Sequence, residues 1–121
     1  MSAGGSAFFS HDIVLVDNGK VTFGGGSDLQ IYHDGSNNYI HSTTSDQDIN
    51  FLGNDGGSTI TALSLDMSAG GDATFAGNVN LTDSKNLKLG AGQDLELFHN
   101  ATDSYIQNVT GHLIISNFAD D

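Results

Sequence analysis

The chain has 121 residues, of which 15 are acidic and 3 are basic, and its formal net charge is −12. Neutralising the phosphates of nucleic acid or of an anionic membrane surface requires Lys and Arg, so this charge argues against both classes of partner. With no cysteine, the chain has neither disulfides nor thiolate metal ligands, and the sequence does not indicate a redox compartment.

The first nine residues contain neither a basic region nor a long apolar run. We therefore expect no signal peptide and no membrane insertion at this end of the chain. If the protein acts outside a cell, it is expected to leave by lysis or by another route.

Short stretches of alternating apolar and polar residues predict strands with one buried face. Leu29, Ile31 and His33, for example, alternate with Gln30 and Tyr32. In chain order, strands are expected at 13–16, 21–23, 29–33, 39–42, 48–52, 59–67, 73–75, 79–82, 87–89, 95–99, 105–109 and 112–117. Residues that tolerate positive φ separate these stretches and predict tight turns: Asn18-Gly19, Asp34-Gly35, Asp55-Gly56-Gly57 and Gly70-Gly71-Asp72. We expect an all-β fold of short strands and tight turns, with no helix of substantial length.

Residues 1–55 align without a gap with residues 67–121, and 19 of the 55 aligned positions are identical. The sequence is thus divided into a first repeat at 1–66 and a second, incomplete repeat at 67–121. Repeats of this kind usually form elongated structures in which each unit contacts its neighbours. We expect the chain to be an excerpt of a longer array.

Each expected strand brings only two or three apolar side chains to a core, which is too little burial to offset the backbone entropy of one repeat. Stacking of successive repeats supplies part of the missing burial, and winding of identical chains around a shared axis supplies the rest. The sequence therefore predicts an obligate homo-oligomer, with three chains as the expected number.

Four segments carry a resemblance to a known group of proteins. Residues 28–40, with the sequence Asp-Leu-Gln-Ile-Tyr-His-Asp-Gly-Ser-Asn-Asn-Tyr-Ile, and their second copy at 94–106 resemble a repeat motif of marine bacteriophage tail fibre and related virion appendage proteins. Residues 62–66 and 71–79 are similar to the connecting module between units of such fibres. Together these segments cover 40 of the 121 residues.

The resemblance implies a trimeric, intertwined, rod-like shaft, similar to a triple β-helix or a β-prism. It also implies a location in the virion, as an extracellular appendage. The implied function is structural, namely a shaft segment that carries host attachment from a distal tip to the particle. The implied partners are further copies of the chain, other tail or virion proteins, and a host cell-surface glycan or protein.

The second copy departs from the first at two places. Asp34-Gly35 is replaced by Asn100-Ala101, which weakens the prediction of a tight turn there. The acidic residues around Asp46 and Asp48 have no acidic match in the ungapped alignment, and their expected equivalents are residues 119–121 after a short insertion.

Histidine is the first candidate for a binding site. His33 and His99 are equivalent and share a face with apolar residues, so copies of either residue on an oligomer axis could bind a transition metal or an anion. The preferred interpretation is a histidine at a strand end whose ring nitrogens bond to a neighbouring turn. No cofactor is otherwise expected. His11, His41 and His112 have no histidine at the equivalent position of the other copy and are expected at the surface.

The runs Gly24-X-Gly26-X-Asp28 and Gly90-X-Gly92-X-Asp94 are faintly similar to calcium-binding β-roll repeats. Those repeats recur about every nine residues, whereas these recur at an offset of 66. A glycine turn that enters a strand is the better interpretation.

The sequence gives little support for catalysis. Carboxylate pairs such as Asp46 with Asp48, or Asp120 with Asp121, could in principle carry acid–base chemistry on sugars. Short strands joined by turns provide little of the concave surface that an active site needs, however. We expect that the protein is not an enzyme.

Aromatic residues give a second candidate site. Tyr32 and Tyr39, with Phe98 and Tyr105 as counterparts, could form a stripe that stacks on sugar rings. The preferred interpretation has Tyr39 and Tyr105 packing with the isoleucine that follows each of them. Tyr32 and Phe98 then remain as the candidate surface-binding residues, if they point outward.

Two other functions stay open beside the shaft. The same repeat could be a receptor-binding module for host surface polysaccharide or an outer-membrane protein. A secreted bacterial adhesin or matrix filament would also fit the composition.

Overall fold

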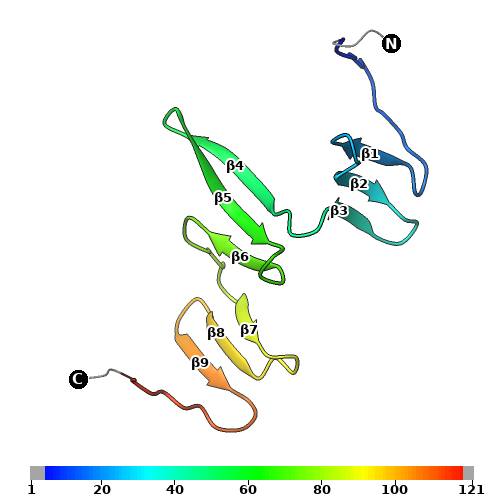
Figure 1. The fold of residues 1–121 in the computed structure, drawn as a ribbon. Helices are drawn as coiled ribbons and strands as arrows, with labels where there is room; N and C mark the ends of the chain where they lie inside the picture. The colour runs from blue at the N-terminus through cyan, green and yellow to red at the C-terminus, as the bar shows by residue number, and fades with distance from the viewer. Residues whose placement is uncertain (1–4, 119–121) are drawn as a thin grey trace. The chain divides into compact units, whose positions relative to one another are not determined.

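The computed structural model describes residues 5–118, and every regular element in this range is a β-strand (Figure 1). The prediction of an all-β fold made of short strands is therefore confirmed. The described residues contain no helix that is long and apolar enough to cross a membrane.

Within residues 5–118, nine strands form three antiparallel sheets of three strands each, and strands that are consecutive in sequence are neighbours in every sheet. The first sheet contains β1 (Lys20–Phe23), β2 (Leu29–His33) and β3 (Asn38–Ser42). The second contains β4 (Ile49–Asp55), β5 (Ser58–Asp66) and β6 (Asp72–Phe75). The third contains β7 (Asn86–Leu89), β8 (Leu95–His99) and β9 (Ser104–Asn108).

The first and third sheets are the two copies of one structure. Each strand of the third sheet begins and ends 66 residues after its counterpart in the first, and the registers correspond, with Ile31 opposite Ile40 and Leu97 opposite Ile106. The backbone hydrogen bonds that flank the sheets also recur: the N–H of Asn18 donates to His33 O at 2.7 Å, and that of Ser84 to His99 O at 2.8 Å. The repeat found in the sequence is thus a repeat of structure.

The second sheet contains residues from both sequence repeats. β6 belongs to the second repeat by alignment, yet it pairs with β5 of the first. The chain accordingly divides into compact units at Met1–Gly77 and Asn78–Asp121, eleven residues after the boundary between 1–66 and 67–121. The division falls there because β6 completes the sheet begun by β4 and β5.

Three expected strands, at 13–16, 79–82 and 112–117, are not paired in the structure. For the last of these the reason is visible in the alignment. In the ungapped alignment residues 115–118 match the start of β4, and β4 pairs with β5, which has no aligned counterpart among the 121 residues. The same reason does not apply to the segments 13–16 and 79–82. The sheet that follows each of them has all three of its strands.

The sheets are two-sided, as the alternation predicted. Residues opposite each other in register share a face, so Val21, Ile31 and Ile40 lie on one face of the first sheet, and Lys20, Tyr32 and Tyr39 lie on the other. The apolar faces are not covered. No side chain in the described residues is buried, and 53% of Ile40 and 63% of its counterpart Ile106 are exposed.

The expected turns form. The turn after β2 is closed by a hydrogen bond of 3.1 Å from the N–H of Asp34 to Asn37 O, with Gly35 at a φ of 99°. Its counterpart is closed at 3.0 Å from Asn100 to Asp103, and Ala101 adopts a φ of 79°. The hydrogen bond that closes the second turn is therefore not weaker than that of the first, contrary to expectation. Ala101 nevertheless adopts a positive φ, a conformation that favours glycine. The region expected to match Asp46 and Asp48, residues 119–121, lies outside the described residues.

Candidate functional surfaces

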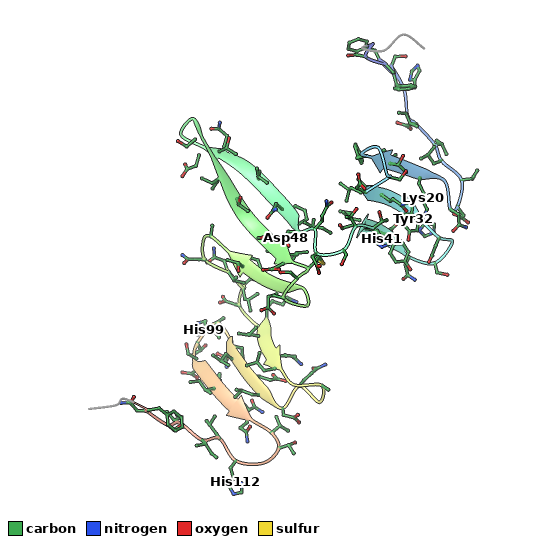
Figure 2. The ribbon with its side chains drawn as sticks, viewed as in Figure 1. Lys20, Tyr32, His41, Asp48, His99 and His112 are labelled. Carbon is green, nitrogen blue, oxygen red and sulfur yellow. The ribbon has the colours of Figure 1, made fainter. Side chains whose placement is uncertain are left out.

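The polar face of the first sheet carries a group of stacked side chains. The rings of Tyr32 and Tyr39 lie 4.8 Å apart between centroids with planes 18° from parallel, because the two residues are directly opposite in the β2–β3 register. Lys20 Nζ lies 4.4 Å from the centroid of Tyr32 and donates to Gln30 Oε1 at 2.7 Å. The His41 ring is tilted at 6.5 Å from Tyr32 (Figure 2). Tyr32 is thus stacked on Tyr39 and also contacts a lysine from β1.

The third sheet repeats the aromatic pair with a different polar surround. Phe98 and Tyr105 stack at 4.7 Å with planes 14° from parallel. The carboxylate of Glu96 accepts a hydrogen bond from the Asn86 amide and lies 3.2 Å from Lys88 Nζ. These contacts hold the pKa of Glu96 below its ordinary value, with the Asn86 bond as the largest cause and the Lys88 bond next. The aromatic pair is common to both copies, whereas the neighbouring charges differ.

The stacking changes the roles expected for these aromatic residues. The prediction that Tyr39 packs with Ile40 is wrong, since neighbouring residues on a strand point to opposite faces. Tyr32 and Phe98, the candidate surface-binding residues, lie on the central strands, and each has one ring face stacked on a tyrosine. Tyr39 and Tyr105 lie on edge strands, so no strand of the same sheet covers their other ring faces. Alternation alone gives the face of a residue but not the strand order that shows which ring is at the edge.

The turn between β2 and β3 is organised by one carboxylate. Asp34 Oδ1 accepts from the backbone N–H groups of Ser36 and Asn37, both at 2.8 Å, and Oδ2 accepts from the Tyr39 hydroxyl at 2.8 Å. The Asn37 bond, followed by the Ser36 and Tyr39 bonds, holds the pKa of Asp34 below its ordinary value of 3.8. The hydrogen bond from the Tyr39 hydroxyl to Asp34 raises the pKa of Tyr39, because loss of the phenolic proton would place a second negative charge beside the carboxylate.

The two histidines lie where the alternation placed them, on the apolar faces. His33 Nδ1 lies 3.1 Å from Asn38 Oδ1, and His99 Nδ1 lies 3.1 Å from Ser104 Oγ. The partners are the first residues of β3 and β9, so both rings bond to the end of the turn that follows their own strand. His33 Nε2 also lies 3.9 Å from Asp17 Oδ1. This geometry matches the preferred interpretation of strand-end histidines.

A metal at His33 or His99 concerns several copies around an axis and stays a prediction. No group of three or more potential metal-ligating side chains occurs within residues 5–118 of the single chain. Elemental analysis of the purified assembly, and its melting temperature with and without a chelator, test that prediction. His11, His41 and His112 are exposed, as expected for surface residues.

The Gly-X-Gly-X-Asp runs have a structural role in the single chain. A Cβ at Gly24 would lie only 2.1 Å from Asp28 Oδ2, and one at Gly92 would lie 2.8 Å from Asp94 Oδ1. The aspartate side chain therefore folds back over the glycine turn and occupies the space that a larger residue would need. Asp28 Oδ1 also accepts from the Thr44 hydroxyl at 3.0 Å. This arrangement supports the interpretation of a glycine turn that enters a strand.

The carboxylates considered for catalysis have local bonding partners. Asp48 Oδ1 accepts from the backbone N–H of Met67 at 3.1 Å, and Asp46 Oδ2 accepts from the Ser45 hydroxyl at 3.2 Å. Asp28 and Asp48 both line an open hollow of about 390 Å³ in the first unit. The pair Asp120 and Asp121 lies outside the described residues.

Comparison of the chain with protein-family models, with curated proteins and with solved structures gave no match.

Proposed function

We propose that the chain is a shaft segment of a homotrimeric fibre, of the kind that forms the tail fibre or another host-attachment appendage of a phage. In this role the protein supplies length and stiffness, and it carries out no chemical reaction. Its partners are further copies of the chain, the adjoining tail or virion proteins, and the host surface reached by the tip. The resemblance of residues 28–40 and 94–106 to fibre repeats supports the placement in a virion.

The observation that carries the proposal is the uncovered apolar face of each sheet. In the first sheet this face is formed by Val21, Phe23, Leu29, Ile31 and Ile40. In the second it is formed by Ile49, Phe51, Leu63, Leu65 and Phe75. In the third it is formed by Leu87, Leu89, Leu95, Leu97 and Ile106. Apolar side chains stabilise a fold when they are removed from water, and contiguous exposed apolar surfaces of this kind mark interfaces.

The charge distribution allows copies of the chain to meet at these faces despite a net charge of −12. In the first and third sheets, no Asp, Glu, Lys or Arg occupies a paired position on the apolar face. The carboxylates lie in turns and on the polar face, where Asp34 and Glu96 are examples. Association through the apolar faces would therefore leave the acidic groups in water, where their repulsion keeps assembled fibres apart.

Native mass spectrometry of the 121-residue chain at micromolar concentration tests the proposal. The expected species contains three 12.6 kDa chains, and electron micrographs of the same sample should show rods of uniform width. A folded monomer would refute the shaft. A stable assembly of another small number would correct the number of chains and leave the role of the apolar faces intact.

A receptor-binding module is the second candidate function, and the aromatic pairs favour it. Tyr39 and Tyr105 each present a ring at a sheet edge, and 39% of Tyr105 is exposed. Flat aromatic surfaces of this kind stack on the apolar faces of sugar rings. A glycan array with the assembled protein and with the Tyr105→Ala variant separates this function from that of a passive shaft. Binding that the variant loses would favour adhesion, and no binding would favour the shaft.

A secreted adhesin or matrix filament would have the same architecture as a phage fibre. The neighbouring genes distinguish these two origins, because a fibre gene of a phage lies among tail, baseplate or capsid genes.

A further inference from the structure

We propose that residues 13–16 and 79–82, here called the bridging segments, are strands that pair only in the assembly, each adding to a free sheet edge of a neighbouring copy of the chain. This inference rests on the self-association in the proposed function and assigns a structural role to two segments that the single chain leaves unpaired.

The bridging segments have strand-forming sequences without strand partners. Residues 13–16 read Ile-Val-Leu-Val and residues 79–82 read Val-Asn-Leu-Thr, which are rich in the β-branched residues that strands favour. Neither segment is in a sheet. Among the described residues, the backbone bond made by each is with the turn that follows it: Val16 O accepts from Gly19 at 2.8 Å, and Thr82 O accepts from Lys85 at 3.1 Å.

Both segments have the same sidedness. Ile13 and Leu15 are 60% and 48% exposed, whereas Val14 and Val16 on the alternate side are 85% and 80% exposed. In the second copy the equivalents of Ile13 and Leu15 are again apolar, while the alternate side carries Asn80 and Thr82. The side of Ile13 and Leu15 is therefore apolar in both copies, as expected of a strand with one face directed to a core.

The missing pairing of the bridging segments differs from that of residues 115–118. Residues 115–118 align with the start of β4 and are unpaired, and β5 has no aligned counterpart among the 121 residues. Residues 79–82 instead lie in sequence between β6 and β7, with complete sheets before and after them. The backbone groups of residues 79–82 therefore remain unpaired in the single chain even though the neighbouring sheets are complete.

A second copy of the chain is the partner of the bridging segments that matches their 66-residue repeat. The bridging segments recur at the 66-residue offset, so their partner must offer a matching strand edge at the same offset. An identical chain in parallel alignment does so, because β1 and β3 of the first sheet and β7 and β9 of the third are free edges at that spacing. Unprotected strand edges accept further strands readily.

Hydrogen–deuterium exchange of the assembled protein tests the inference, and the native mass of the same sample tests the proposed function separately. Amides of residues 13–16 and 79–82 should exchange at least tenfold more slowly than those of the unpaired counterpart of β4 at 115–118. Rapid exchange of the bridging segments in a sample of trimeric mass would overturn the inference and leave the shaft standing. A monomeric mass would overturn both.

Crosslinking distinguishes pairing between copies from pairing within one chain. A Val14→Cys variant is labelled with a benzophenone and assembled from an equal mixture of light-nitrogen and heavy-nitrogen chains. Crosslinked peptides that join residue 14 to residues 20–42 should include pairs with one light and one heavy member. Same-label pairs alone, or no crosslink to these strands, would overturn the inference.

Two variants at neighbouring positions test which side of the bridging segment at 13–16 faces the core of the assembly. Val14→Asn places at residue 14 the residue that the second copy has at its equivalent, so exchange protection and assembly should be unchanged. Leu15→Asn places the same side chain on the inward side and should abolish the protection of residues 13–16. Equal behaviour of the two variants would contradict the inference.

Discussion

The hydroxyl of Tyr39 donates a hydrogen bond of 2.8 Å to Asp34 Oδ2, and this bond is reversed in the second copy. There the Asn100 amide Nδ2 donates to the Tyr105 hydroxyl at 3.2 Å. The other hydrogen bonds of the turn are the same in both copies. Asp34 Oδ1 accepts from the backbone N–H groups of Ser36 and Asn37. At the equivalent positions, Asn100 Oδ1 accepts from the backbone N–H groups of Thr102 and Asp103. The two turns therefore have the same geometry, but the side chain that organises them is the titratable Asp34 in the first copy and the uncharged Asn100 in the second.

This difference predicts that acid destabilises the first turn but not the second. Hydrogen bonds from Asn37, Ser36 and Tyr39 lower the pKa of Asp34 in the folded state. The stabilisation is therefore complete above the ordinary pKa of 3.8 and is lost as the pH falls through the lower folded value. The melting temperature should be measured for the natural chain and for Asp34→Asn from pH 7 to about pH 2. Below about pH 4 it should fall less steeply for the variant.

The reciprocal variant is the control for this prediction. Asn100→Asp should add acid sensitivity in the same pH range, because it places a carboxylate among the same backbone donors. Parallel curves for the natural chain and both variants would show that the carboxylate is not stabilised by the turn.

Removing the two hydroxyls should have unequal effects. In Tyr39→Phe the turn loses a hydrogen bond to a charged acceptor, and in Tyr105→Phe it loses a longer bond from a neutral amide. Bonds to charged groups are stronger than neutral ones. At pH 7 the melting temperature should therefore fall further for Tyr39→Phe. An equal or larger fall for Tyr105→Phe would contradict the assigned hydrogen bonds.

Ala101 offers a stabilising substitution. Its φ of 79° costs an L-residue about 1–2 kcal/mol. Ala101→Gly should therefore raise the free energy of unfolding by about 1 kcal/mol. Gly35→Ala, at a φ of 99°, should lower it by at least a similar amount. Chemical denaturation at one fixed chain concentration measures both, and a loss of stability in Ala101→Gly would contradict the backbone assignment.

The sequence predicted the strands of the first and third sheets because their alternation of apolar and polar residues is local. Ile31 and His33 were placed on one face and Tyr32 on the other by period alone, and the register agrees. The strand expected at 112–117 is not paired because pairing needs a second strand, and no pattern within six residues shows whether that partner is present. The turn at Ala101 kept its form because its hydrogen bonds to Asn100 outweigh the preference of the backbone for glycine.

The candidate surfaces were predictable in composition but not in arrangement. The sequence indicates that Tyr32 and Tyr39 could belong to one aromatic stripe with counterparts in the second copy, but the stacking of their rings on each other depends on the β2–β3 register. The bond between Asp34 and Tyr39 spans a turn, and it could have been predicted from their separation of five residues across a tight hairpin. Coverage of the apolar faces depends on other chains, which one sequence does not describe.

Neighbouring residues on β3 test which face is buried in the assembly. Ile40 lies on the apolar face, so Ile40→Asn should cost at least the 2–5 kcal/mol per chain seen for large truncations in protein cores and should prevent assembly. His41 lies on the polar face, and its counterpart is Gln107. His41→Gln should therefore change stability by no more than about 0.5 kcal/mol. Similar effects of the two variants, measured by denaturation and native mass, would contradict the assignment of the faces.

The dependence of the melting temperature on chain concentration tests most directly the claim that the sheets are stable only when copies of the chain cover them. In a dilution series followed by circular dichroism, folding that requires association gives a melting temperature that falls with dilution. We predict such a fall, with loss of β-structure at the lowest concentrations. A cooperative transition at the same temperature across the whole series, in a sample of monomeric mass, would contradict the account.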